Sequence, residues 1–453
     1  MRRKKHFRLS TTHIILLSFI AVIFLGGFLL WLPISHANGV SISFTDALFT
    51  ATTATCVTGL VTVPTATAWS YFGQAVILVL IQVGGLGVIT VMSGIMLLMN
   101  KRMGLGGRLL LQDAFNLNTL SGMVKFVRHV ILGTFTVEGI GAVLYMTVFI
   151  PQFGWKGIWI SVFNSVSAFC NAGMDVIGEN SLCDYISNPL VNAVTCALII
   201  MGGIGYVVWL DVARVVRNGK GKRRRLFHDL TLHSKLAISV SAFLIFAGAA
   251  LILFFEYDNP LTMKELSLFD KIQLAFFQSV TTRTAGYITV PQQYLTTAST
   301  ALCLLLMFIG GSPVGTAGGI KTVTVAVLMI SALESVQGRN EVSVFGRRIS
   351  KSAVTKSVAV CMTSVTIVVL STLLLSATTD ADLADVLYET VSATATVGLS
   401  RNLTPGLNEL GKLILIVTMY LGRVGPISFA LALNSNRKKE NIIKEPTEDI
   451  SVG

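Results

Sequence analysis

Charged side chains are scarce in this sequence. Only 13% of the 453 residues are Asp, Glu, Lys or Arg, whereas 53% are apolar, and the mean hydropathy is +0.71. One soluble core cannot bury so large an apolar fraction, so the composition excludes an ordinary water-soluble protein. The chain needs lipid as part of its solvent, and each helix that crosses the roughly 30 Å hydrocarbon layer needs about 20 apolar residues.

Residues for metal, cofactor or acid–base chemistry are sparse as well. There is no CxxC, HExxH or GxGD motif and no nucleotide-binding signature. Ser312, in a Gly-Gly-Ser-Pro sequence, faintly resembles an intramembrane protease nucleophile, but all six histidines precede it and lie near loops or membrane edges. We therefore predict no enzyme, no cofactor and no structural metal in this chain. The six scattered cysteines indicate no disulfide framework: Cys56, Cys170, Cys183, Cys196, Cys303 and Cys361.

Long apolar runs are present, and they predict a polytopic all-α membrane protein with eight transmembrane helices. The run 301–333 is interrupted by glycines between residues 310 and 319. A cleavable signal peptide is the alternative for the first run, because basic residues precede it and Ser35-His36-Ala37 follows, but the run is long for that purpose. The predicted spans are 14–32, 75–99, 130–150, 190–210, 236–255, 301–333, 358–375 and 413–433.

Basic and acidic residues alternate between successive hydrophilic stretches. Asp175, Asp258 and Asp380 lie in the acidic stretches. By the positive-inside rule both termini and the basic linkers are cytoplasmic, which agrees with an even number of crossings. The net charge of +12 is explained by this topology, and nucleic-acid binding is not predicted, since no aromatic-interleaved basic patch occurs. The basic clusters are residues 2–8; Lys101, Arg102 and Arg108; 220–225; 339–356; and 437–439.

Four internal repeats are the most informative feature. Each contains a segment that runs from an aromatic residue through small and hydroxylated residues to a glycine ten positions on. The glycines are spaced by 114, 113 and 112 residues, which chance rarely produces. The four segments are FTATTATCVTG (49–59), FNSVSAFCNAG (163–173), FFQSVTTRTAG (276–286) and YETVSATATVG (388–398). A glycine cluster follows each segment, beginning at Gly84, Gly202, Gly310 and Gly422.

Each repeat therefore predicts a spanning helix, a short pore helix with a glycine loop, and a second spanning helix. The short segments are too polar to span, and irregular backbone at membrane depth survives only where protein buries it or where it lines a water-filled path. Four parallel repeats of this kind predict one pseudo-fourfold pore. Backbone carbonyls can replace the hydration shell of a cation, and no ring of carboxylates offers an alternative. The C-terminal ends of the pore helices also favour a cation.

Two other interpretations compete with the pore. Threonine, serine and glycine can simply allow close helix packing. A secondary transporter with alternating access would show inverted repeats and a midplane site, whereas these repeats are parallel and fourfold. The registration of all four segments favours the channel-like path.

The loops TCVTGL, NAGM, TRTAGY and TVGL, with Gly-Gly-x-Gly helices behind them, resemble the Trk/Ktr/HKT superfamily of potassium transporters. With eight spans the chain is similar to the membrane subunits of bacterial Ktr uptake systems (KtrB/KtrD type). The resemblance implies a selectivity filter for potassium, with sodium as a candidate coupling or activating ion; Gly59 favours potassium, because sodium-preferring relatives carry serine there. Cys56 and Cys170 depart from the residues expected there. The implied filter residues are Thr55, Cys56, Val57, Thr58, Gly59; Cys170, Asn171, Ala172, Gly173; Arg283, Thr284, Ala285, Gly286; and Ala395, Thr396, Val397, Gly398.

The glycine-rich break resembles the intramembrane gating loop of that superfamily; a simple helix kink is the alternative. Arg423 occupies the repeat position that Gly85, Gly203 and Gly311 hold elsewhere. A charge at that depth is costly and usually functional, so we predict a cation on the pore axis that interacts with the break, against a snorkelling role. For Lys321, a second cation near the exit and a snorkelling lysine are equally good interpretations. The predicted gating residues are Gly310, Gly311, Ser312, Pro313, Gly315, Thr316, Ala317, Gly318, Gly319, Lys321 and Arg423.

The domain organisation follows the repeats. We place repeat 1 at 1–100, repeat 2 at 101–211, repeat 3 at 212–333, repeat 4 at 334–433 and a cytoplasmic tail at 434–453. The linkers are too short for independent domains. The resemblance implies a bacterial cytoplasmic-membrane location, a homodimer, and a separate RCK-type subunit (KtrA/KtrC type) that carries the nucleotide.

Overall fold

The structure is a computed structural model, described here for residues 11–99, 104–114, 122–218, 226–339 and 341–425. These residues are mostly helical, with one two-stranded hairpin, β1 (Ser343–Val344) and β2 (Arg347–Arg348). The helices are α1 (Thr11–Trp31), α2 (Phe44–Cys56), α3 (Thr65–Ala68), α4 (Tyr71–Leu86), α5 (Val88–Leu98), α6 (Leu105–Ala114), α7 (Met123–Phe153), α8 (Lys156–Cys170), α9 (Pro189–Gly203), α10 (Tyr206–Asn218), α11 (Leu226–Asp229), α12 (Leu232–Glu256), α13 (Leu268–Thr281), α14 (Thr297–Phe308), α15 (Thr322–Val336), α16 (Lys351–Ser376), α17 (Leu383–Ala395) and α18 (Glu409–Val424).

Four helices, α1, α7, α12 and α16, are long and apolar enough to cross a membrane. In their most apolar stretches about a third of the residues or fewer are buried. The outward side chains are large and apolar, for example Phe24, Phe135 and Phe243. Such surfaces suit lipid, which supports the expected membrane protein.

The second helix of two repeats bends where a continuous span was predicted. The run 75–99 is divided into α4 and α5, which meet at 96°, and the run 190–210 is divided into α9 and α10, which meet at 94°. Gly87 (φ 85°) and Gly205 (φ 94°) occupy the breaks, and this left-handed conformation is one that glycine adopts without strain. The structure therefore breaks both predicted runs, and each bent pair can count as one broken span.

The break predicted in the third repeat is present: α14 ends at Phe308 and α15 begins at Thr322. Counting each bent pair as one span gives up to six spans among the described residues, so the full count of eight stays a prediction. Of the run 413–433, the structure describes only the part to Gly425, where α18 has just ended. The tail 434–453 and the basic residues at 2–8, 101–102, 220–225 and 437–439 lie outside the described residues.

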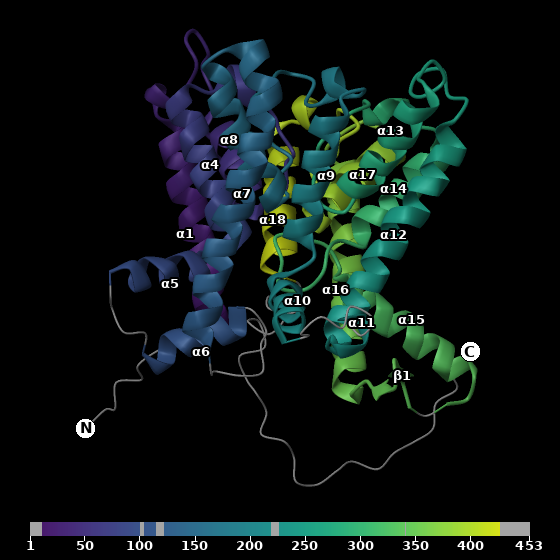
Figure 1. Cartoon of the computed structure of the whole chain (residues 1–453). Helices are drawn as coiled ribbons and strands as arrows, with labels where there is room; N and C mark the ends of the chain where they lie inside the picture. Colours follow the sequence, from purple (N-terminus) through teal and green to yellow (C-terminus); the bar gives the residue numbers. More distant parts are fainter. Residues whose placement is uncertain (1–10, 100–103, 115–121, 219–225, 340, 426–453) are drawn as a thin grey trace.

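The four short helices α2, α8, α13 and α17 are buried over their C-terminal parts. Every residue of α2 from Ala47 to Cys56 is buried, polar threonines included. At one end of the structure lie α5, α6, α10, α11, α15 and the hairpin (Figure 1). The C-terminal parts of the short helices thus carry hydroxylated side chains into the protein interior, an arrangement that suits an internal polar path.

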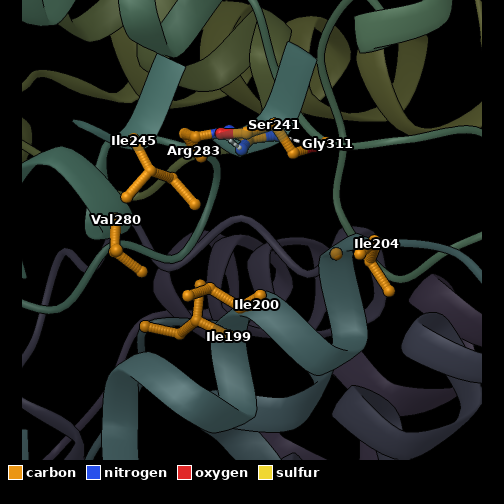
Figure 2. Close-up of a pocket in the computed structure, with 9 residues that line it drawn as sticks. Ile199, Ile200, Ile204, Ser241, Ile245, Val280, Arg283 and Gly311 are labelled. Carbon is orange, nitrogen blue, oxygen red and sulfur yellow. Dashed lines mark hydrogen bonds between the residues drawn. The ribbon is translucent and has the colours of Figure 1, made fainter. Parts of the chain in front are cut away.

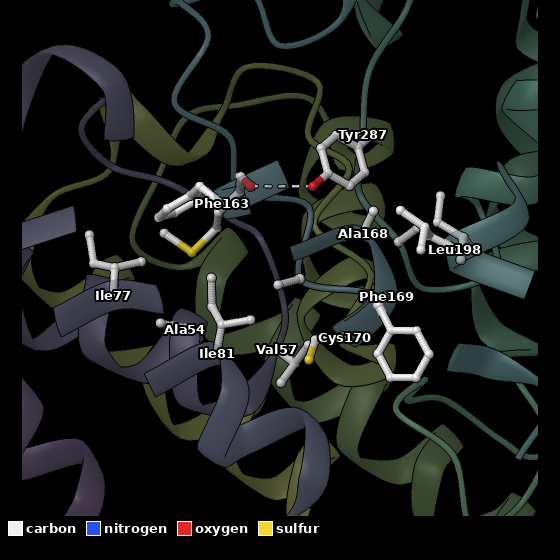
Figure 3. Close-up of a cluster of buried hydrophobic side chains, with 14 of the residues drawn as sticks. Ala54, Val57, Ile77, Ile81, Phe163, Ala168, Phe169, Cys170, Leu198 and Tyr287 are labelled. Atoms are coloured by element: carbon white, nitrogen blue, oxygen red, sulfur yellow. Dashed lines mark hydrogen bonds between the residues drawn. The ribbon is translucent and has the colours of Figure 1, made fainter. Parts of the chain in front are cut away.

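Apolar side chains pack the space between the short and the long helices (Figure 3). In the largest cluster Val57 and Cys170, at the ends of α2 and α8, pack with Ile81 of α4. Tyr287 joins this cluster, and its hydroxyl donates to the carbonyl oxygens of Asn164 (3.3 Å) and Met174 (3.4 Å). Packing on the outer side therefore fixes the ends of the short helices.

Candidate functional site

The glycines that end the four repeated segments form a closed ring. A Cβ on any of these ring glycines would collide with the backbone of the next loop: Gly59 with Ala172, Gly173 with Ala285, Gly286 with Val397, and Gly398 with Thr58. In each case the colliding atom is the carbonyl oxygen of the residue that precedes the neighbouring ring glycine. The contacts run from the first loop to the fourth and back to the first, so the loops encircle one axis in chain order.

The backbone takes the same unusual turn in all four loops. The residue two positions before each ring glycine has a positive φ: Val57 (56°), Asn171 (61°), Thr284 (70°) and Thr396 (51°). This left-handed conformation is uncommon for residues other than glycine, and for the β-branched Val57, Thr284 and Thr396 it is strained. The surrounding protein therefore imposes a positive φ at the same position of all four loops.

Hydroxyl groups from the last turn of each short helix hold these loops. Thr53 Oγ1 accepts from the Gly59 N–H (2.9 Å), and Ser392 Oγ accepts from the Gly398 N–H (3.0 Å). Ser167 Oγ donates to the Met174 carbonyl (2.6 Å), and Thr281 Oγ1 donates to the Tyr287 carbonyl (2.7 Å). The hydroxylated residues of the repeat therefore hold the backbone of the loop. The residue types alone did not indicate this role.

The third segment is shifted by one residue relative to the predicted alignment, which began at Phe276. Phe277 is the buried counterpart of Phe49, Phe163 and Tyr388. Ser279 Oγ donates to the Ile245 carbonyl (2.8 Å), as Ser165 Oγ donates to the Glu138 carbonyl (2.6 Å). The third segment thus has one residue fewer between its buried aromatic and its ring glycine than the other three.

The glycine clusters pack directly behind the short helices. A Cβ on Gly84, Gly202 or Gly422 would overlap the carbonyl oxygen of Thr55, Phe169 or Thr394, each four residues before a ring glycine. In the third repeat Gly310 packs instead against Gly318. The sequence 310–319, which we name the intramembrane segment, therefore departs from the pattern of the other repeats.

A cavity of about 470 Å³ opens on one side of the ring, and all four ring glycines line it. Its wall is formed by the loops that follow the ring, with Thr62, Asn180 and Asn402 among the polar residues and Asp175 and Glu179 as its carboxylates. The backbone of the ring glycines forms the floor of the cavity, and the two carboxylates favour cations in it.

The intramembrane segment contacts three of the four loops or their supporting helices, two of them through hydrogen bonds. The Gly318 N–H donates to Thr284 Oγ1 (3.1 Å), and Thr316 Oγ1 donates to the Phe169 carbonyl (3.1 Å). Gly318 also lies against Thr396 and Ala395. The Ser312 N–H donates to the Gly203 carbonyl (2.8 Å), and the Tyr206 N–H donates to the Val314 carbonyl (2.8 Å). These bonds give partners to the backbone polar groups of an irregular segment. A simple helix kink would leave fewer such groups in need of partners.

Arg423 and Lys321 both bind this segment. Arg423 Nη1 donates to the Thr316 carbonyl (2.6 Å), and its Nη2 donates to the Gly84 carbonyl (2.6 Å). Lys321 Nζ donates to the Ala317 carbonyl (2.6 Å). Arg423 therefore contacts the break, and the Lys321 ammonium turns back onto the segment.

The side chain of Arg283 points into the protein, beside a cavity of about 20 Å³, about the room of one water molecule (Figure 2). Its guanidinium donates to the carbonyl (3.1 Å) and hydroxyl (3.1 Å) of Ser241 and to the Gly310 carbonyl (3.3 Å). Arg283 thus links the third loop to α12 and to the start of the intramembrane segment. The repeat motif indicates a role only for the backbone of Arg283, and no sequence pattern points to Ser241.

Glu138 was also missed. It is buried on α7, directly behind the second loop, where the Cys170 thiol lies 3.8 Å from its Oε1. A glutamate inside a predicted apolar span was the available sequence signal. Among the described residues no group of three or more His, Cys, Asp or Glu side chains could hold a metal ion.

Comparison with known proteins gives concordant matches. The family model described as "TrkH: Cation transport protein" matches residues 2–443. The chain is 39% identical to the potassium/sodium uptake protein NtpJ of Enterococcus hirae, over 100% of this chain and 99% of that protein. It is 37% identical to the Ktr system potassium uptake protein B of Bacillus subtilis, over 99% and 98%. The solved structure of the potassium transporter TrkH from Vibrio parahaemolyticus matches with a TM-score of 0.74 at 18% identity, over 96% of this chain and 87% of that one.

Proposed function

Because the chain belongs to the TrkH family of cation transport proteins, we propose that it is the ion-conducting subunit of a potassium uptake system, with the ring of four glycines as its selectivity filter. The observation that carries the proposal is the closed ring, in which each glycine contacts the loop of the next repeat. Backbone oxygens around one axis can replace the water around a potassium ion. The names of NtpJ and of the Ktr relative, both potassium uptake proteins, support the choice of ion.

The proposed path begins in the 470 Å³ cavity, crosses the ring and meets the intramembrane segment. The ions pass the carbonyls of the four loops, with Gly59, Gly173, Gly286 and Gly398 in the ring itself. The segment, held by Arg423 and Lys321, closes the path below the ring, and two positive charges there raise the barrier to a cation. Opening requires that these hydrogen bonds to Thr316 and Ala317 break.

We also propose the assembly that the family resemblance implies. The chain forms a membrane homodimer in the cytoplasmic membrane with both termini in the cytoplasm. An RCK-type regulatory subunit that binds nucleotide controls the segment from the cytoplasmic side. Sodium is the candidate coupling ion, as the name of the NtpJ relative, a potassium/sodium uptake protein, suggests.

The test is rubidium uptake by a bacterium that lacks its own potassium uptake systems and expresses this chain with an RCK-type partner. We expect growth at low potassium and uptake of ⁸⁶Rb⁺ that unlabelled potassium competes away more effectively than sodium. Gly173→Ala, whose Cβ would collide with Ala285, should abolish uptake while the protein still reaches the membrane. Normal uptake by that variant would show that the ring is not the filter.

A further inference from the structure

The residues two positions after the ring glycines all line the 470 Å³ cavity. We name them the mouth residues; they are Val61, Asp175, Ile288 and Ser400, one from each repeat. They follow equivalent glycines in four loops that encircle one axis, so together they surround the approach to the ring. An ion that enters the ring from this cavity must pass them.

Asp175 is the only mouth residue with a charged side chain. Val61 and Ile288 are apolar, and the Ser400 hydroxyl donates its proton to Glu389 Oε1. None of the ion pairs that the described residues form includes Asp175. The four mouth residues therefore bring one negative charge to the ring, and this charge has no positive side chain as a partner.

The Asp175 carboxyl is enclosed and held in place. Only 9% of the residue is exposed, whereas Glu179, the other carboxylate of the cavity, is an exposed residue. The Ile177 N–H donates to Asp175 Oδ1 (3.3 Å), and the Ser181 hydroxyl lies close to the carboxyl. Ser181 Oγ also accepts from the Ile288 N–H of the third loop (3.4 Å). An ionised carboxylate offers about four lone-pair sites, so these few donors leave sites open for an ion.

We propose that Asp175 forms an entry site for the transported cation, just outside the ring and beside the second loop. The proposal rests on the proposed function and adds the group that binds the ion before the ring does. A carboxylate is a hard oxygen ligand of the kind that alkali cations bind. An enclosed charge without a partner is costly, and a cation beside it removes that cost.

An entry site of this kind sets the affinity for the ion. A fixed negative charge in a cavity raises the local concentration of cations, and it acts more strongly where little water surrounds it. Loss of the charge therefore raises the KM for uptake. The maximal rate is retained, because at saturating concentrations the ring and the intramembrane segment limit the flow. Ion selectivity also stays with the ring, since one carboxylate does not enclose an ion in a cage of fixed size.

The test measures how ⁸⁶Rb⁺ uptake depends on rubidium concentration in the bacterium that expresses this chain with an RCK-type partner. We expect Asp175→Asn to raise KM several-fold with little change in maximal rate, and Asp175→Glu to stay close to the wild type. Asp184→Asn is the matched control and should keep the wild-type KM. Asp184 is exposed on the same loop and is not among the residues that line the cavity.

A double variant separates the charge from the structure of the second loop. Asp175→Asn combined with Val61→Asp moves the carboxylate to the first loop, to a mouth residue that lines the same cavity. If the charge at the mouth sets the affinity, the double variant should recover a KM near that of the wild type. A side chain that only holds the second loop together could not be replaced from another loop.

An unchanged KM in Asp175→Asn overturns the entry site. A lower maximal rate at unchanged KM, or a double variant that reaches the membrane and is no better than Asp175→Asn, assigns Asp175 a purely structural role and also overturns the entry site. These results leave the proposed function intact, because the wild-type chain still takes up ⁸⁶Rb⁺. Absence of uptake by the wild-type chain with its partner would instead overturn the proposed function, and the entry site with it.

Discussion

Arg423 and Thr316 are joined by a 2.6 Å hydrogen bond from the guanidinium to a backbone carbonyl. The bond links the last described helix, α18, to the intramembrane segment of the third repeat, 107 residues earlier in the chain. The same guanidinium holds the Gly84 carbonyl of the first repeat. One side chain therefore connects three repeats, at the place where we propose that the path is closed.

Arg423→Gln should increase ion flux. Glutamine is too short and has no charge, so it removes two charge-assisted hydrogen bonds and the positive field. We expect several-fold faster ⁸⁶Rb⁺ uptake into proteoliposomes that contain this chain without a partner subunit. Lys412→Gln is a suitable control, since Lys412 pairs with Asp46 at 2.8 Å and does not touch the segment. Unchanged or slower flux in Arg423→Gln would contradict the role of this arginine in closing the path.

Gly84→Ala should damage both stability and uptake. The added Cβ would overlap the Thr55 carbonyl, and overpacking of this kind costs about 1–3 kcal/mol. We expect a lower melting temperature and little uptake, whereas Gly178→Ala should behave as wild type, because nothing lies within 4 Å of a Cβ there. Equal behaviour of the two variants would show that α4 does not pack closely behind the first loop in the working protein.

Arg283→Lys should loosen the start of the intramembrane segment. A lysine ammonium cannot span the Ser241 carbonyl, the Ser241 hydroxyl and the Gly310 carbonyl as the planar guanidinium does. Hydrogen bonds to charged groups contribute about 1.5–3 kcal/mol each, so a clear drop in melting temperature is expected. Retained stability together with faster flux would show that Arg283 acts in gating and does not stabilise the fold. If neither stability nor flux changes, Arg283 has neither role.

The convergence of the loops could be predicted from the sequence because only glycine fits the ring. Gly59 and its counterparts combine a positive φ with backbone contact on the side of the missing Cβ. Their even spacing in the sequence therefore predicts four equivalent loops. The position of Arg423 could be predicted for the same reason, because glycines at the equivalent positions of the other three repeats leave the space that its side chain enters. The number of spans was harder to predict, because α5 and α10 continue the apolar runs of α4 and α9. A hydropathy pattern does not reveal the bends at Gly87 and Gly205.

Other features depend on packing that no local pattern encodes. Phe276 and Phe277 are adjacent aromatics, and only burial shows that Phe277 is the repeat residue. The direction of the Arg283 side chain depends on Ser241, 42 residues away in α12. Glu138 lies behind the second loop because α7 packs on α8, and its sequence neighbours do not indicate that contact.

Thr53→Val and Thr53→Ser test whether loop shape, rather than composition, gives selectivity. Valine keeps the shape of threonine but removes the acceptor for the Gly59 N–H, which leaves a buried donor unsatisfied at a cost of about 1–3 kcal/mol. We expect Thr53→Val to lower the preference for potassium over sodium in competition against ⁸⁶Rb⁺ uptake, and Thr53→Ser, which keeps the hydroxyl, to preserve it. Ser392→Ala should act like Thr53→Val, because Ser392 holds Gly398 in the fourth repeat in the same way (3.0 Å). If the valine variant discriminates between the ions as well as the wild type, the hydroxyl only stabilises the fold, and the selectivity must come from the glycine ring without its support.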